Sequence, residues 1–231
     1  MVLKGLQKTT LLDFPGKLAC TVFTSGCNFR CPFCHNASLV TRPSEVENIS
    51  VENFFSYLEK RKGLLDGVCI TGGEPLINKD IEDFIKSIKE TGLLVKLDTN
   101  GSFPDRLEGL LDSGLVDYVA MDIKNSLSKY AHTAGVDPDF DTDCILRSIN
   151  IIMNKAKEYE FRTTVVRELH DKEDILSIAQ MLIGTNKYFL QKYTDSGDIL
   201  CSGYSAYTDA QMTEICESAK IILPCTALRG V

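Results

Sequence analysis

Short apolar segments alternate along the chain with longer segments in which apolar residues recur every three or four positions. Each short segment is followed by a polar or glycine-rich turn, as expected of a buried strand. These segments predict six strands: Ala19–Thr24, Gly67–Thr71, Leu93–Asp98, Val116–Ile123, Arg162–Val166 and Tyr188–Gln191. The longer repeats predict amphipathic helices: Val51–Arg61, Asp80–Glu90, Pro104–Ser113, Asp143–Tyr159 and Lys172–Leu182.

This alternation of strands and helices indicates an α/β fold. Strands joined by helices form a parallel sheet with right-handed crossovers, which is either doubly wound or an incomplete barrel. Such sheets carry their chemistry at the carboxyl ends of the strands. Polar clusters follow the predicted strands: Ser25-Gly26-Cys27, Thr71-Gly72-Gly73-Glu74-Pro75, Asp98-Thr99-Asn100-Gly101, Asp122-Ile123-Lys124 and Gln191-Lys192. We therefore expect these clusters to meet at one rim of the fold.

The composition bounds the size, location and partners of the protein. A chain of 231 residues suits one α/β domain over 1–231, and no apolar run reaches the length of a membrane span. The opening MVLKGLQKTTLLDFPGK mixes apolar with charged residues, unlike a signal or transit peptide, so we expect a cytoplasmic protein without a membrane partner. The net charge of −7 argues against a nucleic-acid partner, because phosphate binding needs a basic face.

Three of the nine cysteines lie close together, in Cys27-Asn28-Phe29-Arg30-Cys31-Pro32-Phe33-Cys34-His35-Asn36. Thiolates at this spacing let one loop surround an iron–sulfur cubane, and three ligands leave one iron open for a substrate. The alternative is structural zinc held by the three cysteines and His35, since such sites are four-coordinate. Because His35 is adjacent to Cys34, joint ligation of one ion by both is geometrically awkward.

The CxxxCxxC motif after the first predicted strand, with aromatic Phe33 before its third cysteine, resembles the radical S-adenosylmethionine (SAM) superfamily. The continuation Cys34-His35-Asn36 resembles the glycyl-radical-enzyme activases of that superfamily. The resemblance implies that Cys27, Cys31 and Cys34 hold a [4Fe-4S] cluster. It also implies that Phe33 lies against the adenine of SAM, whose edge meets backbone groups near Cys34 and His35.

Two glycine-containing turns extend the resemblance. Taken alone, Thr71 to Pro75 is as well explained by an ordinary turn, but it matches the GGE motif of the family. That match implies close backbone approach at Gly72 and Gly73 and a contact between Glu74 and the methionine ammonium of SAM. The Asp98-Thr99-Asn100-Gly101 segment contains the Asn-Gly pair of a type I′ turn. It also matches the DTNG of pyruvate formate-lyase activating enzyme, which implies that Asp98 and Thr99 belong to the polar shell of SAM.

Asp122 and Lys124 are two residues apart on a predicted strand and therefore share a face. Burial of both without partners would be costly, so they must meet solvent, each other or a ligand. The match to the DLK-type motif of the activases implies that Lys124 binds the SAM carboxylate, whereas an ion pair at a surface edge is the alternative. At the sixth strand end the activase pattern has a histidine that contacts the ribose, and Gln191 could make hydrogen bonds there instead.

Residues beside the fifth predicted strand are harder to assign. Arg162 and Arg167 flank this strand, and either could face the site or cap the barrel. His170 is a lone loop histidine, and such residues are more often solvated than catalytic.

The resemblance implies a fold, a reaction and partners. The fold is a partial (β/α)6 TIM-like barrel of the radical SAM type. The reaction is reductive cleavage of SAM to a 5′-deoxyadenosyl radical, with an electron from flavodoxin or ferredoxin. The implied protein substrate is a glycyl-radical enzyme. Because the chain most resembles the activating proteins of anaerobic ribonucleoside-triphosphate reductase, that reductase is the expected partner. Two alternatives stay open: a small-molecule radical SAM enzyme such as a 7-carboxy-7-deazaguanine synthase, and a non-catalytic zinc or iron–sulfur binding module.

Overall fold

The computed structural model describes residues 1–195 and 197–230. Within these residues the strands form one sheet in the order of the sequence. The strands are β1 (Leu3–Thr10), β2 (Ala19–Thr24), β3 (Gly67–Gly72), β4 (Leu94–Thr99), β5 (Tyr118–Asp122), β6 (Tyr159–Val165), β7 (Tyr188–Lys192) and β8 (Thr226–Arg229). β1 runs antiparallel to β2, and every following pair is parallel. Because neighbouring strands are consecutive in the chain, the sheet winds in one direction, as the wall of a barrel does, with β1 and β8 at its two edges.

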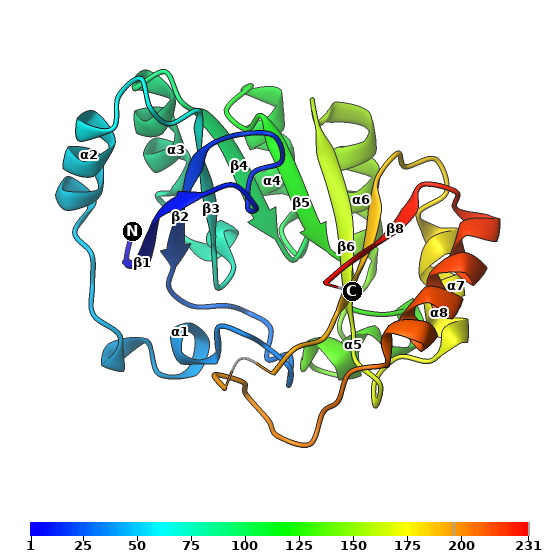
Figure 1. Cartoon of the computed structure of the whole chain (residues 1–231). Helices are drawn as coiled ribbons and strands as arrows, with labels where there is room; N and C mark the ends of the chain where they lie inside the picture. Colours follow the sequence, from blue (N-terminus) through cyan, green and yellow to red (C-terminus); the bar gives the residue numbers. More distant parts are fainter. Residues whose placement is uncertain (196, 231) are drawn as a thin grey trace.

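The helices between the strands are α1 (Ala37–Thr41), α2 (Val51–Lys60), α3 (Ile81–Glu90), α4 (Pro104–Asp112), α5 (Tyr130–Ala134), α6 (Asp143–Lys155), α7 (Lys172–Met181) and α8 (Asp209–Ile222). Short 3₁₀ turns lie at Pro43–Glu45, Pro75–Ile77 and Leu127–Lys129. Figure 1 shows the longer helices along the outer side of the curved sheet, with α1 and α5 near the carboxyl ends of β2 to β5. Loops and short helices, rather than the long helices, therefore surround the carboxyl ends of the strands.

The parallel α/β architecture confirms the predicted fold class, and all six predicted strands are present as β2 to β7. The structure adds two edge strands. In β1 only the first and last residues are buried, so the apolar pattern of a strand is lost between them. β8 has four residues, too few for a periodic signal. The fourth predicted helix also ends earlier than expected, at Lys155, because Tyr159 already belongs to β6.

The barrel is filled differently at its two ends. At the amino ends of the strands Phe14 packs edge-on against Tyr118, with 6.0 Å between ring centroids, in a small cluster with Ala19 and Ala120. Gly67 has no side chain to obstruct Phe14 there. The apolar plug closes this end, so polar groups within the barrel reach solvent at the carboxyl ends.

Within the described residues, no helix is both long and apolar enough to cross a membrane.

Candidate active site

One pocket opens at the carboxyl ends of the strands, with a volume of about 160 Å³. It is lined by the loop after β2, the ends of β3, β4 and β5, and Thr164 of β6. Twelve residues singled out in the sequence line this pocket: Cys27, Cys31, Phe33, Cys34, His35, Gly72, Gly73, Glu74, Asp98, Thr99, Asp122 and Lys124. Four of the five polar clusters thus contribute residues to one pocket although they lie up to about a hundred residues apart, whereas Gln191-Lys192 does not line it.

The cysteine loop is held against the segment around α5. The backbone N–H of Arg30 donates to the carbonyl oxygen of Ala134 at 2.9 Å, and the Cys31 thiol lies 3.6 Å from the same oxygen. Gly135 permits this approach, because a Cβ atom there would lie 2.2 Å from the carbonyl oxygen of Arg30. The loop is thus fixed in the pocket wall by backbone contacts on its buried side.

The thiols differ in their surroundings. The sulfur of Cys27 accepts a hydrogen bond from the N–H of Phe29 at 3.3 Å and lies 3.8 Å from Nδ2 of Asn100. Burial raises the pKa of Cys27 and raises that of Cys31 to about 12. Both thiols are therefore protonated at neutral pH when no cation is near, and binding of iron must release their protons.

The donor set fits an iron–sulfur cluster better than one shared ion. In the described part of the chain, no three His, Cys, Asp or Glu side chains converge as the ligands of one metal ion do. A cubane makes a different demand, because each cysteine ligates its own iron and the thiolates surround the cluster. Three thiols that line one pocket meet that demand.

Glu74 joins the two glycine-containing turns. Its carboxylate accepts hydrogen bonds from the N–H of Asn100 at 2.7 Å and the hydroxyl of Thr99 at 2.9 Å. The side chain is 1% exposed, and burial raises its pKa to about 7. Among the described residues no Lys or Arg lies within salt-bridge distance of it, and the cation that acts on its carboxylate is Lys124 of the same pocket wall. Gly73 allows this packing, since a Cβ there would lie 1.7 Å from the carbonyl oxygen of Gly26.

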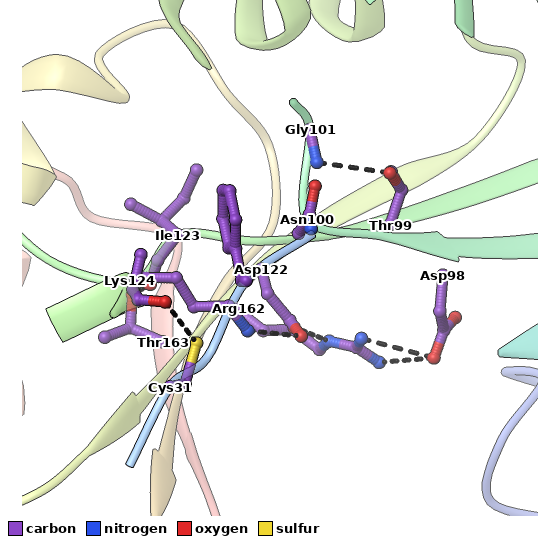
Figure 2. A network of polar contacts seen from close by, with 12 residues as sticks. Cys31, Asp98, Thr99, Asn100, Gly101, Asp122, Ile123, Lys124, Arg162 and Thr163 are labelled. Atoms are coloured by element: carbon purple, nitrogen blue, oxygen red, sulfur yellow. Dashed lines mark hydrogen bonds and ion pairs between the residues drawn. The ribbon is translucent and has the colours of Figure 1, made fainter. Parts of the chain in front are cut away.

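A line of buried charges crosses the barrel beneath the pocket (Figure 2). Nε of Arg162 donates to Asp122 at 2.9 Å, and both terminal nitrogens lie 3.2 Å from one oxygen of Asp98. Lys96 contacts the other oxygen of Asp98, and Nζ of Lys124 lies 3.1 Å from Asp122. Strand pairing creates this line, because Asp122 is directly opposite Arg162.

The charges hold each other in the ionised state. Burial would raise the pKa of Asp122, but the positive charges of Arg162 and Lys124 outweigh it and hold that pKa well below its usual range. In the same way burial would lower the pKa of Lys124, and Asp122 keeps it above its usual range. The side chain of Lys124 is only 17% exposed and faces the pocket, so the pair does not lie at an outer surface edge.

Several site residues were missed or misassigned in the sequence. Asn100 lies beside Cys27, and Nδ2 of Asn36 donates to the carbonyl oxygen of Gly72 at 2.8 Å. His170 is not solvated: it is 1% exposed, and its Nε2 lies 2.7 Å from the carbonyl oxygen of Lys124. The asparagines could have been found from their positions within the motifs, whereas His170 carried no local signal.

Two assignments around the fifth predicted strand are now settled by position. Arg162 faces the barrel interior, whereas Arg167 is exposed.

Gln191 is not among the described residues that line the pocket. It pairs in the sheet with Thr164, which does line it, so the ribose contact expected of Gln191 stays a prediction.

The segment that follows β7 covers the cysteine loop. Figure 1 shows this segment, in orange, at the same end of the molecule as α1 and α5. The N–H of Cys201 donates to the carbonyl oxygen of Pro32 at 2.9 Å, and Tyr193 stacks on His35 with 5.8 Å between ring centroids. Nearby, Ser38 donates to Asp198 at 2.7 Å.

The radical SAM superfamily model matches residues 21–182, and the chain belongs to this superfamily. A Methanocaldococcus jannaschii protein with the provisional name glycyl-radical enzyme activating enzyme is 32% identical over 195 residues, which cover 83% of this chain and 80% of that protein. The 7-carboxy-7-deazaguanine synthase of Methanopyrus kandleri is 29% identical over 207 residues, or 79% and 76% of the two chains. A domain of pyruvate-formate lyase-activating enzyme from Bacteroides vulgatus superposes with a TM-score of 0.55 at 18% identity, covering 71% of this chain and 99% of that one.

Membership of the superfamily implies a [4Fe-4S] cluster and SAM as cofactors. Because the sequence identity to the solved structure is low, that comparison shows a shared fold and nothing about function.

Proposed function

We propose that this protein is a glycyl-radical-enzyme activase that binds a [4Fe-4S] cluster on Cys27, Cys31 and Cys34. The observation that carries the proposal is the convergence of these thiols with the buried carboxylate of Glu74 and the ammonium of Lys124 on one pocket. When bound, the cluster supplies an electron for cleavage of SAM, whose 5′-deoxyadenosyl radical takes a hydrogen atom from a glycine of the partner.

The pocket wall matches the two charges on the methionine part of SAM. Glu74 offers a buried carboxylate that forms no salt bridge within the described residues, which suits the ammonium group. Lys124 offers a cation, which suits the carboxylate, while Asp122 and His170 hold its side chain and backbone in place. The ammonium and carboxylate of SAM would thus meet two protein charges of opposite sign, and Lys124 would contact the SAM carboxylate in addition to Asp122.

The remaining predicted contacts concern the nucleoside part of SAM. Phe33 is buried in the pocket wall, so its ring presents a fixed surface for the adenine. The edge of the adenine would meet backbone groups near Cys34 and His35, and the ring of His35 is stacked on Tyr193. Gly72 and Gly73 leave the backbone free to approach the ligand. Asp98 and Thr99 are held by Arg162 and Glu74, which keeps the polar shell in one arrangement. Gln191 is proposed for the ribose on the resemblance alone.

The partner we propose is anaerobic ribonucleoside-triphosphate reductase, with flavodoxin or ferredoxin as electron donor. The name of the M. jannaschii relative supports a glycyl-radical enzyme as the partner, and so does the sheet, which is open between β1 and β8 within the described residues. An open barrel can admit a loop of a macromolecule. The choice of this reductase and of the electron donor rests on the resemblance alone. A second candidate function is a 7-carboxy-7-deazaguanine synthase, favoured by the M. kandleri relative that aligns over most of this chain.

The test is transfer of a labelled hydrogen. The reduced, cluster-loaded protein is incubated anaerobically with SAM and the reductase deuterated at glycine Cα. The proposal predicts deuterium in 5′-deoxyadenosine and a doublet glycyl-radical signal in the electron paramagnetic resonance spectrum. Absence of both with several glycyl-radical enzymes, together with label transfer from a small metabolite, would favour the second candidate.

A further inference from the structure

Arg229 lies on the edge strand β8, beyond the part of the chain that the superfamily model matches. Its two terminal nitrogens lie 2.8 and 2.7 Å from the two oxygens of Glu160. The guanidinium also lies over the ring of Phe189, 3.5 Å from its centroid. A guanidinium held by two parallel hydrogen bonds and a ring has one orientation.

Glu160 is a buried carboxylate that needs this cation. It is 1% exposed, and besides Arg229 it accepts a hydrogen bond from the hydroxyl of Tyr118 at 2.9 Å. A buried carboxylate that loses its cation keeps the full cost of desolvation. The nearest other cation in a salt bridge with it is Arg162, 3.9 Å away.

Arg162 has a different task in the structure, because it holds the two carboxylates of the pocket wall. It lies 2.9 Å from Asp122 and 3.2 Å from Asp98, both closer than Glu160. Glu160 and Arg162 are two residues apart on β6 and share a face. Glu160 thus competes with Asp98 and Asp122 for the guanidinium of Arg162. Arg229 relieves this competition because it pairs with Glu160.

We propose that Arg229 is a positioning residue for SAM: by pairing with Glu160 it leaves Arg162 free to hold Asp98 and Asp122 in the pocket wall. The inference rests on the proposed function, since it takes these carboxylates as part of the SAM shell. Loss of Arg229 draws Arg162 toward Glu160 and loosens both carboxylates. The cluster ligands are not part of this chain of contacts.

The test measures SAM affinity in the anaerobic, cluster-reconstituted protein by equilibrium binding, with iron content and an unfolding transition recorded for each variant. Arg229→Gln should weaken SAM binding about tenfold, as contacts within one network couple strongly, and should leave iron content unchanged. Adding Glu160→Gln removes the competing charge and should recover most of the lost affinity. Arg147→Gln, which breaks an exposed pair with Asp105, is the matched control and should bind SAM as the unmodified protein does.

Rescue separates positioning from simple anchoring of β8, because an anchoring role predicts that the double variant binds as weakly as Arg229→Gln or more weakly. Either that result or unchanged affinity in Arg229→Gln overturns the inference. If Arg229→Gln does not fold, Arg229→Lys replaces it: one ammonium cannot occupy both oxygens of Glu160, so a smaller loss with the same rescue is expected, and no loss overturns the inference. Failure of the unmodified protein to bind SAM would count against the proposed function instead.

Discussion

Replacement of Lys124 by alanine tests the assignment of the pocket most sharply among single substitutions. Lys124 is the lysine that faces the pocket, and its ammonium lies 3.1 Å from Asp122. Asp122 keeps Arg162 at 2.9 Å when Lys124 is lost, so the buried carboxylate retains a cation and the wall should stay folded. The effect should therefore fall on the ligand rather than on the fold.

The size of the effect follows from the burial of the lysine. Removal of one partner of a desolvated charge pair costs about 2–5 kcal/mol. Because the side chain is still 17% exposed, we take the lower end. About 2 kcal/mol corresponds to roughly 30-fold weaker binding of SAM. Lys124→Arg keeps the charge and should lose less.

The assay is equilibrium binding of SAM to reconstituted protein, with iron determined in the same samples. Iron content should not change, since the lysine ligates no iron. Lys155→Ala removes a cation from an exposed group with Asp112 and Glu108 and serves as the control. SAM affinity within about twofold of the unmodified protein in Lys124→Ala, a loss below the 2–5 kcal/mol range, would show that Lys124 does not bind the ligand.

Two further predictions concern the fold that supports the pocket. Gly73→Ala places a Cβ atom 1.7 Å from a backbone carbonyl oxygen of the cysteine loop and should cost about 1–3 kcal/mol of unfolding free energy in urea, whereas Gly109→Ala, with open space around it, should cost little. Burial would raise the pKa of Asp117, but its hydrogen bonds from Lys89, the N–H of Val95 and Lys157 together outweigh this and lower the pKa. Its stabilising contribution is therefore present above the ordinary pKa near 4 and is lost as the pH falls through the lowered value. Asp117→Asn should lessen the loss of stability on acidification, and an equal effect from the exposed control Asp105→Asn would refute that reasoning.

Where the signal is local, the sequence predicted which residues line the same pocket. Cys27, Cys31 and Cys34 lie within eight residues, and Glu74 comes two residues after the end of β3, so their convergence follows from the rule for parallel sheets. The central six strands were predictable because a polar or glycine-rich turn follows each of these short segments.

What escaped prediction depends on contacts between distant residues. Glu160 and Arg229 are 69 residues apart, and neither position shows in the sequence that it will meet the other. His170 looks like an ordinary loop residue until the fold brings it to the backbone of Lys124, 46 residues away. The edge strand β1 has an exposed middle, so its pairing with β2 rather than its own pattern makes it a strand.

The central claim is that three cysteines of one loop hold a cluster that cleaves SAM, and joint measurement of iron and 5′-deoxyadenosine tests it most directly. After anaerobic reconstitution and reduction, the unmodified protein should hold about four irons per chain and convert SAM to 5′-deoxyadenosine and methionine. Cys27→Ala, Cys31→Ala and Cys34→Ala should each lose the stable cluster and the product, whereas Cys20→Ala, at a buried position within β2, should keep both. Full iron and undiminished SAM cleavage in any of the three variants would contradict the account.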